Sequence, residues 1–468
     1  LDIGAQYIVQ NNKNMVSQGQ YYNPLPSLYL FPRGDNFDEI RLYERYNTNY
    51  GYMEQYWPYG DASLSLQNPY WIQNRINRTS NKKRYMMNAS LKWQAADWLN
   101  VVGRVNLDNS DYRNKNEKSA STLTTFCGVS GGFEDAMRQE RSLYADFLAN
   151  IDKTFGDFHL TANVGASIYH TSMDQLYIAG DLVIPNFFQI NNINFSANYK
   201  PDPTGYEDEI QSIFASAELS WKNQLYLTVT GRNDWDSKLA FSKQKSFFYP
   251  SVGLSALLSE MVKLPEVISY AKIRGSYTVV ASSFDRFLTN PGYEYNSQTH
   301  NWANPTVYPM DNMKPEKTKS WEIGLNLKFW GNRFNLDATY YRSNTLNQTF
   351  KVDIPSSSGY KQAIVQAGNV QNQGLELALG FNDKWAGFGW SSNATFTLNR
   401  NKVKRLASGS VNPVTGEAIQ MDEMNVGWLG KENVAPRVIL TEGGSMTDIY
   451  VYNQLTKDNN GNIKVDQN

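Results

Sequence analysis

The feature that most constrains the fold is an alternation of apolar and polar residues with a period of two, which recurs along most of the chain. In residues 84–93, Tyr85, Met87 and Leu91 share one phase, and polar residues occupy the other. Successive side chains of a β-strand point to opposite faces of a sheet, so each such segment predicts a strand with one apolar and one polar face. About thirteen segments follow this pattern, and most of them come in pairs. The sequence therefore predicts antiparallel hairpins.

The connections between these segments alternate in length. Short connections lie near 94–97, 155–157, 222–224, 259–269, 330–333 and 383–388. Long connections lie at 13–82, 109–141, 172–208, 235–246, 281–314, 345–371 and 402–468. A soluble sandwich has no reason to place every long loop at one end, whereas a transmembrane β-barrel has short periplasmic turns and long extracellular loops. The pattern predicts an all-β, antiparallel transmembrane β-barrel.

Aromatic residues support this interpretation, because they flank most of the short connections. Trp93 and Trp98 flank the first of them, and Trp385 and Trp390 flank the last. Aromatic rings concentrate at the membrane–water interface, so we expect them to form an aromatic girdle on the periplasmic side.

Composition excludes several other classes of protein. The hydrophobic content is 41% and the mean hydropathy is −0.54, and no stretch approaches about 18 consecutive apolar residues, which excludes a bundle of transmembrane helices. A barrel strand needs only about ten alternating residues, so the low hydropathy does not exclude a barrel. A net charge of −1 gives no support to nucleic-acid binding. The single cysteine, Cys127, excludes an internal disulfide.

The polar phase of the strands defines a second group of residues. Charge is costly on the lipid face of a barrel and tolerated in its lumen, so we expect the charged residues opposite the apolar phase to line the lumen. The predicted lumen residues are Arg104, Glu218, Arg232, Asp234, Lys272, Arg274, Glu322, Asp337 and Glu376.

One strand boundary is ambiguous. Residues 135–151 also fit a helix, because Met137, Tyr144 and Phe147 share a helical face. We predict a strand that begins at Ser142, because it then pairs across a tight turn with 158–168.

Two long loops are rich in aromatic residues. The segment 21–71 holds fourteen aromatics with few aliphatic residues, and 285–308 repeats the pattern more weakly. The predicted contact residues are Tyr50, Tyr52, Tyr56, Trp57, Tyr59, Tyr70, Trp71, Tyr293, Tyr295 and Trp302. Tyr and Trp combine a flat apolar face with a polar group. Three roles stay open: packing of the loops against one another, contact with a partner lipoprotein, and stacking on cargo.

Four stretches resemble a known family. They are YYNPLPSLYLFPRGDNFDE with LQNPYWIQNR in the first long loop, and the segments 230–260, 313–348 and 368–380. The chain resembles the TonB-dependent transporters of bacterial outer membranes, specifically the SusC/RagA type of Bacteroidetes, over essentially its whole length. The resemblance implies a 22-stranded barrel preceded by a plug and a TonB box. We therefore expect residues 1–468 to form part of one barrel domain, with the plug, the TonB box and the C-terminal strands outside the given chain.

The resemblance also implies a function. It implies active import across the outer membrane of an oligosaccharide or peptide, together with a SusD-like surface lipoprotein and with the TonB complex, which would act through the absent N-terminal part. No nucleic-acid partner is expected. The alternatives are a passive porin or structural outer-membrane protein, and an outer-membrane barrel hydrolase.

Motifs for catalysis or metal binding are weak. Residues 128–132 match the G-x-S-x-G pattern around Ser130, but His159 and His170 fall in a predicted strand, and a glycine-rich loop tip is the preferred interpretation. Residues 458–462 partly match a calcium loop, but the glycine falls two places early and no glutamate follows. A turn built on Asn-Gly fits better. We expect no enzyme activity, metal site or cofactor, and no motif supports Ca²⁺ in the loops or a partner.

Overall fold

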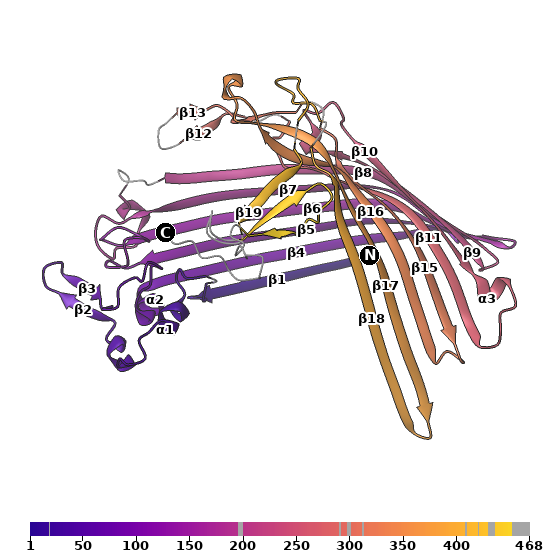
Figure 1. Cartoon of the computed structure of the whole chain (residues 1–468), viewed down its shortest axis with the longest axis horizontal. Coiled ribbons are helices and arrows are strands. Elements are labelled where there is room, and N and C mark those ends of the chain that lie inside the picture. Colours follow the sequence, from indigo (N-terminus) through magenta and orange to yellow (C-terminus); the bar gives the residue numbers. More distant parts are fainter. Residues whose placement is uncertain are drawn as a thin grey trace, which may run out of the picture.

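The computed structural model describes residues 1–17, 19–194, 200–289, 292–296, 301–310, 313–407, 410–419, 421–428 and 436–451. In this part of the chain, one sheet of fourteen strands dominates the molecule (Figure 1). Thirteen of the strands are long, and each pairs antiparallel with the next in the order β1-β4-β5-β6-β7-β8-β9-β10-β11-β15-β16-β17-β18, whereas the short β14 pairs parallel with β17. The predicted all-β fold and strand number are confirmed.

The strands of this sheet have the following bounds. They are β1 (Asp2–Lys13), β4 (Ile76–Ala96), β5 (Leu99–Lys118), β6 (Gly132–Phe155), β7 (Phe158–Asp181), β8 (Lys200–Trp221), β9 (Leu225–Asp236), β10 (Phe247–Leu257), β11 (Ile268–Ser282), β14 (Val307–Tyr308), β15 (Glu316–Phe329), β16 (Phe334–Asp353), β17 (Gln362–Trp385) and β18 (Phe388–Arg405). Figure 1 shows that the sheet is strongly twisted and curved, with the short turns gathered at one end of the strands.

The register separates the two faces of the sheet. Arg104 lies opposite Asp146, and the same cross-strand row continues through Ser167 and Ser212 to Asp234. Residues two apart in a strand share a face, and following the register across the sheet puts all nine predicted lumen residues on this one face, which we call the polar face. That they line a lumen stays a prediction.

The opposite face, which we call the apolar face, is exposed. Phe147, Val164 and Ile213 expose 55%, 52% and 56% of their surface, although they lie in central strands. At the short-turn end this face carries contacting aromatic rings. Phe329 stacks on Phe334 with ring centroids 5.7 Å apart, and the ring contacts continue through Phe381, Trp385, Phe388 and Trp390. This arrangement fits the expected aromatic girdle at the periplasmic interface.

The strands extend much further than the sequence pattern indicates. β6 begins at Gly132, so the prediction that the strand starts at Ser142 is wrong by ten residues, and the connection after β5 shrinks to 119–131. β7 likewise runs to Asp181, beyond the predicted end. The outer part of β5, residues 109–118, is polar on both faces, and cross-strand pairs such as Arg113 with Asp135 (2.8 Å) support it without an apolar contrast. On β6 and β7, Phe133 and Ile178 belong to a small buried cluster beyond the predicted strand ends.

Small elements fill the longer connections. They are α1 (Pro24–Tyr29), η1 (Phe37–Arg41), β2 (Glu44–Asn47), β3 (Tyr52–Gln55), α2 (Pro69–Arg75), η2 (Ile190–Asn192), η3 (Ser237–Leu239), α3 (Leu258–Met261), β12 (Glu294–Asn296), β13 (Asn301–Ala303), η4 (Ser356–Ser358), β19 (Glu423–Trp428), β20 (Arg437–Thr441) and β21 (Ile449–Tyr450). Among the described residues, no helix has the length and apolar character needed to cross a bilayer. Within the described ranges, buried apolar side chains form three small clusters rather than one large core, and one of them surrounds Trp71.

Candidate functional site

The first outer loop, residues 14–75, is a folded unit, and Asn68 lies at its centre. Asn68 caps α2, because its Oδ1 accepts a hydrogen bond from the backbone N–H of Tyr70 at 2.9 Å, and Pro69 occupies the first helical position. The Nδ2 of Asn68 donates to the backbone carbonyls of Ile40 (2.8 Å) and Tyr56 (3.0 Å). Asn68 has no exposed surface. One side chain therefore joins three segments of the loop.

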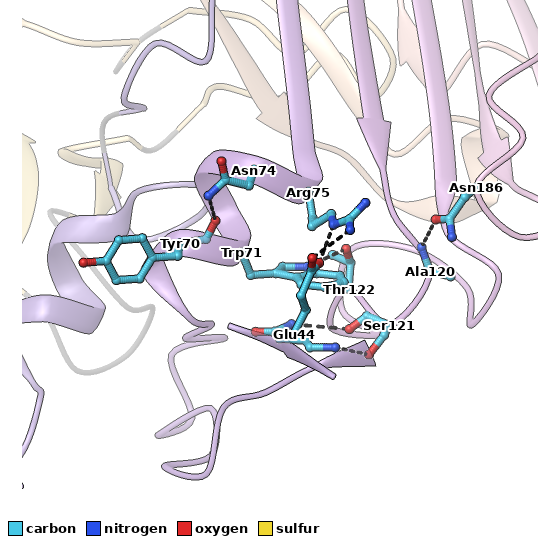
Figure 2. Close-up of polar contacts among 10 residues, drawn as sticks. Glu44, Tyr70, Trp71, Asn74, Arg75, Ala120, Ser121, Thr122 and Asn186 are labelled. Atoms are coloured by element: carbon cyan, nitrogen blue, oxygen red, sulfur yellow. Dashed lines mark hydrogen bonds and ion pairs between the residues drawn. The ribbon is translucent and has the colours of Figure 1, made fainter. Parts of the chain in front are cut away.

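Trp71 anchors the loop to the barrel. Its ring is fully buried, and its Nε1 donates to Thr122 Oγ1 at 3.1 Å (Figure 2). Next to it, the backbone N–H of Gln55 donates to Ser121 Oγ at 3.0 Å. Both hydroxyls belong to the connection 119–131. Trp71 is one of the predicted aromatic contact residues, for which loop packing, a partner and cargo stay open. In this structure it has no accessible surface and packs one outer loop against another.

An ion pair joins the end of α2, just before β4 begins, to the β2–β3 hairpin of the first outer loop. Arg75 Nε and Nη2 donate to the two carboxylate oxygens of Glu44 at 2.5 Å and 2.9 Å (Figure 2). The hydrogen bonds from Glu44 raise the pKa of Arg75 above its ordinary value. The carbonyl of Arg75 accepts a bond from the N–H of Ser119 at 3.0 Å. Glu44 lies in β2, so this pair orients the β2–β3 hairpin.

The remaining predicted aromatic residues of the first outer loop lie near its surface and contact other side chains of the same loop. Tyr50 is 63% exposed and stacks on Tyr52, with ring centroids 5.6 Å apart. Trp57 contacts Tyr59 edge to face at 5.0 Å. The other contacts are Tyr70 stacked on Tyr43 at 6.4 Å and the Arg45 guanidinium 3.5 Å above the ring of Tyr56.

The second aromatic loop presents a smaller group. Tyr295 and Trp302 face each other across the β12–β13 hairpin with ring centroids 5.1 Å apart, and Tyr293 lies just before the hairpin. Trp302 and Tyr293 are 67% and 66% exposed. These large exposed rings are unusual for a surface that contacts only water.

Several charged residues of the polar face form ion pairs with one another, whereas no ion pair is formed by Lys272, Glu322 or Glu376 among the described residues. Arg104 binds Asp146 through two hydrogen bonds of 2.9 Å and 2.6 Å, and the Asp146 side chain is fully buried beneath it. Arg274 reaches Asp337 at 3.0 Å. Other predicted lumen residues behave in the same way: Arg232 pairs with Asp234 at 2.7 Å, and Glu218 accepts from Thr228 at 3.1 Å. Bidentate pairs such as Arg104 with Asp146 fix both side chains and neutralise each other's charge.

Comparison with known proteins agrees with this architecture. A family model described as "TonB dependent receptor-like, beta-barrel" matches residues 22–462, nearly the whole chain. The chain belongs to this family. TonB-dependent receptor-like barrels of this type are outer-membrane proteins, so the predicted family and location are confirmed.

Two relatives from Bacteroidetes illustrate the similarity. The TonB-dependent receptor P3 of Formosa agariphila is 25% identical over 301 residues, which cover 62% of this chain and 30% of the relative. The TonB-dependent receptor SusC of Bacteroides thetaiotaomicron is 26% identical over 278 residues, covering 55% of this chain and 26% of SusC. The matches thus span less than a third of the curated relatives.

A solved structure shares the fold of this TonB-dependent receptor-like barrel. The RagAB peptide importer in its open-open state aligns with a TM-score of 0.70 at 15% identity, covering 97% of this chain and 51% of that chain. Its closed-closed state aligns with a TM-score of 0.68, covering 99% and 51%. At this identity the likeness shows the fold alone.

Sequence reasoning missed a buried cluster at the outer end of the TonB-dependent receptor-like barrel. Lys118 forms an ion pair with Glu134 and donates to the carbonyl of Phe126 at 3.1 Å. Burial disfavours the charged form of Lys118, but Glu134 outweighs this effect and holds the pKa of Lys118 above its ordinary value. Tyr22 lies against Lys118, and its ring contacts the ring of Phe126 in a tilted arrangement with centroids 4.9 Å apart. The only sequence signal is a lysine at a strand end, which is too common to indicate burial.

The residues with catalytic or metal-binding patterns do not converge in the described part of this TonB-dependent receptor-like barrel. His159 lies 2.8 Å from Asp152, and His170 lies 3.6 Å from Glu209, and neither forms a hydrogen bond with Ser130. No group of three His, Cys, Asp or Glu side chains among the described residues could hold a metal ion. The third histidine of the chain, His300, and the segment 458–462 with the partial calcium-loop pattern lie outside the described residues.

Proposed function

We propose that the chain is part of an outer-membrane active importer. In this proposal, residues 1–468 form part of one larger barrel that takes up an oligosaccharide or peptide with a SusD-like surface lipoprotein, and the TonB complex supplies the energy. The observation that carries the proposal is the two-faced sheet: an exposed apolar face suits lipid, and the opposite face gathers all nine predicted lumen residues. Membership of the TonB-dependent receptor-like family supports it.

The sheet edges support the idea of a larger barrel. β1 pairs only with β4, and β18 pairs only with β17 among the described residues. Backbone groups cannot stay unpaired in a bilayer, because each unsatisfied group costs several kcal/mol. Strands beyond these two edges would pair them and close the wall around the polar face.

The mechanism in this proposal needs no covalent chemistry. Ion pairs such as Arg104 with Asp146 keep the polar face hydrated, and they bind each other's charge rather than that of the cargo. The outer loops act at the mouth. The buried residues Asn68 and Trp71 hold the first outer loop in place, while the exposed pairs Tyr50 with Tyr52 and Tyr295 with Trp302 contact the lipoprotein lid.

An uptake experiment tests active import. We would delete the chromosomal gene, restore it, and measure uptake of labelled oligosaccharides and peptides with and without a protonophore. Active import predicts that uptake requires the gene and stops when the protonophore collapses the inner-membrane gradient. Gene-dependent uptake that continues unchanged with the protonophore would favour the passive porin.

A second experiment tests the role of the exposed rings. The variant Tyr50→Ala/Tyr52→Ala should reduce co-purification of the surface lipoprotein and reduce uptake, while the amount of folded barrel stays constant. Unchanged association and unchanged uptake would assign these rings to loop packing. A loss of uptake with intact association would instead assign them to cargo.

A further inference from the structure

Positively charged residues gather on the apolar face of β15 to β18, four strands that pair with one another in sequence order (Figure 1). The register places their side chains on the same face as Ile323 and Leu375 of the apolar band. We call this group the basic patch. Its members are Lys317, Lys319, Arg342, Arg400 and Lys402.

The basic patch begins where the apolar band ends. Counted from the aromatic girdle at the short turns, the residues of β15 on this face are Phe329, Leu327, Leu325, Ile323 and Trp321, and Lys319 follows. A barrel strand crosses the hydrocarbon core with about 9–11 residues, which is the length of 321–329. Trp321 contacts the ring of Tyr340 at 5.5 Å, and such rings are typical of the membrane–water interface. The basic patch therefore lies at the depth of the lipid headgroups.

No carboxylate balances the basic patch on its own face. In 317–329, 334–346, 369–381 and 390–402, every Asp and Glu lies on the polar face; these are Glu322, Asp337 and Glu376. No member of the basic patch forms an ion pair or a side-chain hydrogen bond with another described residue. The patch is thus a local excess of positive charge.

The side chains of the basic patch are available to a ligand. Lys319, Arg400 and Lys402 are exposed, and Arg342 is half-buried. The cross-strand neighbours of Arg342 are Trp321 and Gln373, which carry no charge.

The spacing within the basic patch suits a phosphate group. Arg342 and Arg400 lie in one cross-strand row, two strands or about 10 Å apart, and Lys319 and Lys402 lie in the next row, about 7 Å further along the strands. Guanidinium and ammonium groups form strong, charge-assisted hydrogen bonds with phosphate oxygens. Gln373, between the two arginines, adds amide donors.

The other flank of the sheet has mixed charge at the same depth. On β4, residues 85–93 form the apolar band above the short turn, and Lys83 follows. Lys83 lies directly opposite Asp111, and Arg141, one row lower, shares its row with Glu207. Cations on this flank therefore lie beside carboxylates. The basic patch is a feature of one side of the wall and not a ring around it.

We propose that the basic patch binds the phosphate group of an anionic lipid in the outer leaflet of the outer membrane. Arg342 and Lys319 bind the phosphate oxygens, and the acyl chains pack below on Ile323 and Leu375. The inference rests on the barrel wall of the proposed function, in which the apolar face meets lipid, and it does not depend on import.

The test uses the full-length protein, delipidated in a nonionic detergent. Native mass spectrometry measures the dissociation constant of the first bound phospholipid. Phosphatidylglycerol is the anionic probe, and phosphatidylcholine, whose choline balances its phosphate, is the neutral one. Each Lys or Arg near an anionic membrane surface strengthens the attraction about fivefold, so Lys319→Gln/Arg342→Gln should lower the preference for phosphatidylglycerol about 25-fold.

The matched control is Lys83→Gln/Arg141→Gln, which makes the same change of charge on the same face and at the same depth. It should keep the wild-type preference. Arg342→Glu puts a carboxylate in the middle of the patch and should make phosphatidylglycerol bind more weakly than phosphatidylcholine. Heat-modifiable gel migration confirms that each variant is a folded barrel.

Four results would overturn the inference. They are a wild type without preference for phosphatidylglycerol, a patch variant that keeps the preference, an equal loss in the patch variant and the control, and displacement of the lipid by an equal concentration of inorganic phosphate, which would indicate a site for soluble anions. The uptake experiment separates this inference from import: a patch variant that loses the lipid and still imports affects the patch alone, and passive uptake by a protein that binds the lipid affects import alone.

Discussion

The hydrogen bonds of the buried Asn68 side chain predict how much local stability the first outer loop loses when this residue is replaced. Replacing Asn68 with alanine removes the cap of α2 and both bonds from Nδ2, and it leaves the buried carbonyls of Ile40 and Tyr56 without their donor. A lost cap costs about 1 kcal/mol, and each lost bond costs about 1 kcal/mol more when a buried partner stays unsatisfied. The first outer loop should therefore lose about 3 kcal/mol of local stability.

Hydrogen–deuterium exchange of the full-length protein measures this loss directly. Exchange of amides in 37–75 follows local opening of the loop, so a loss of about 3 kcal/mol should accelerate it by about a hundredfold. The strands near the short turns should exchange at their wild-type rate, because Asn68 has no contact with them.

Asn74 provides the matched control. It lies in the same helix, is exposed, and its Nδ2 bonds only the carbonyl of Tyr70 one turn earlier at 2.8 Å (Figure 2). Asn74→Ala should change exchange by less than threefold. The reasoning is refuted if Asn68→Ala behaves like Asn74→Ala, or if the strands near the short turns lose protection together with the loop.

Three further predictions follow from the two faces and from the buried thiol. Val164→Arg, on the apolar face near mid-membrane depth, should reduce barrel stability by about 2–4 kcal/mol, whereas the neighbouring substitution Asn163→Arg on the polar face should be tolerated. Denaturant titration of the two variants in vesicles compares their free energies of unfolding. Equal losses would contradict the assignment of the two faces. Arg104→Ala leaves the fully buried Asp146 carboxylate without its cation and should cost about 3 kcal/mol by the same titration; Lys222→Ala, which breaks an exposed pair with Asp157, should cost below about 1 kcal/mol. Burial raises the pKa of Cys127 to about 11. Because the thiolate is the reactive form, alkylation at pH 8 should be about a hundredfold slower than for an ordinary thiol, and its rate should rise up to about pH 11. Fast labelling of the folded protein at pH 8 would show that the thiol is not buried.

The parts of the fold that the sequence predicts are those where one physical contrast dominates. Within the membrane a strand must alternate apolar with polar residues, so the hairpins, the short turns and the residues of the polar face could be identified from the period alone. Above the membrane that contrast disappears. Residues 109–118 are polar in both phases, and they are held in the ladder by partners such as Asp135, which lies in the next strand. The sequence gives no sign of which residues pair there.

The candidate site shows the same limit. Asn68 followed by Pro69 is a readable helix start, and the density of aromatic residues in 21–71 is plain in the sequence. Burial of Trp71 depends on Thr122, fifty-one positions further along the chain, and no local pattern encodes that contact.

Because the strands extend beyond the membrane, the wall of the mouth is ordered before a ligand binds. β6 and β7 each contain 24 residues, about 80 Å of strand at about 3.3 Å per residue, whereas the apolar band of an outer-membrane barrel is about 25 Å tall. Fixing a backbone residue costs about 1–2 kcal/mol of conformational entropy, and in this molecule that cost falls on folding rather than on binding. The mouth is thus preorganised: a ligand that binds there meets a wall of fixed shape, and its affinity depends on fit rather than on ordering flexible loops.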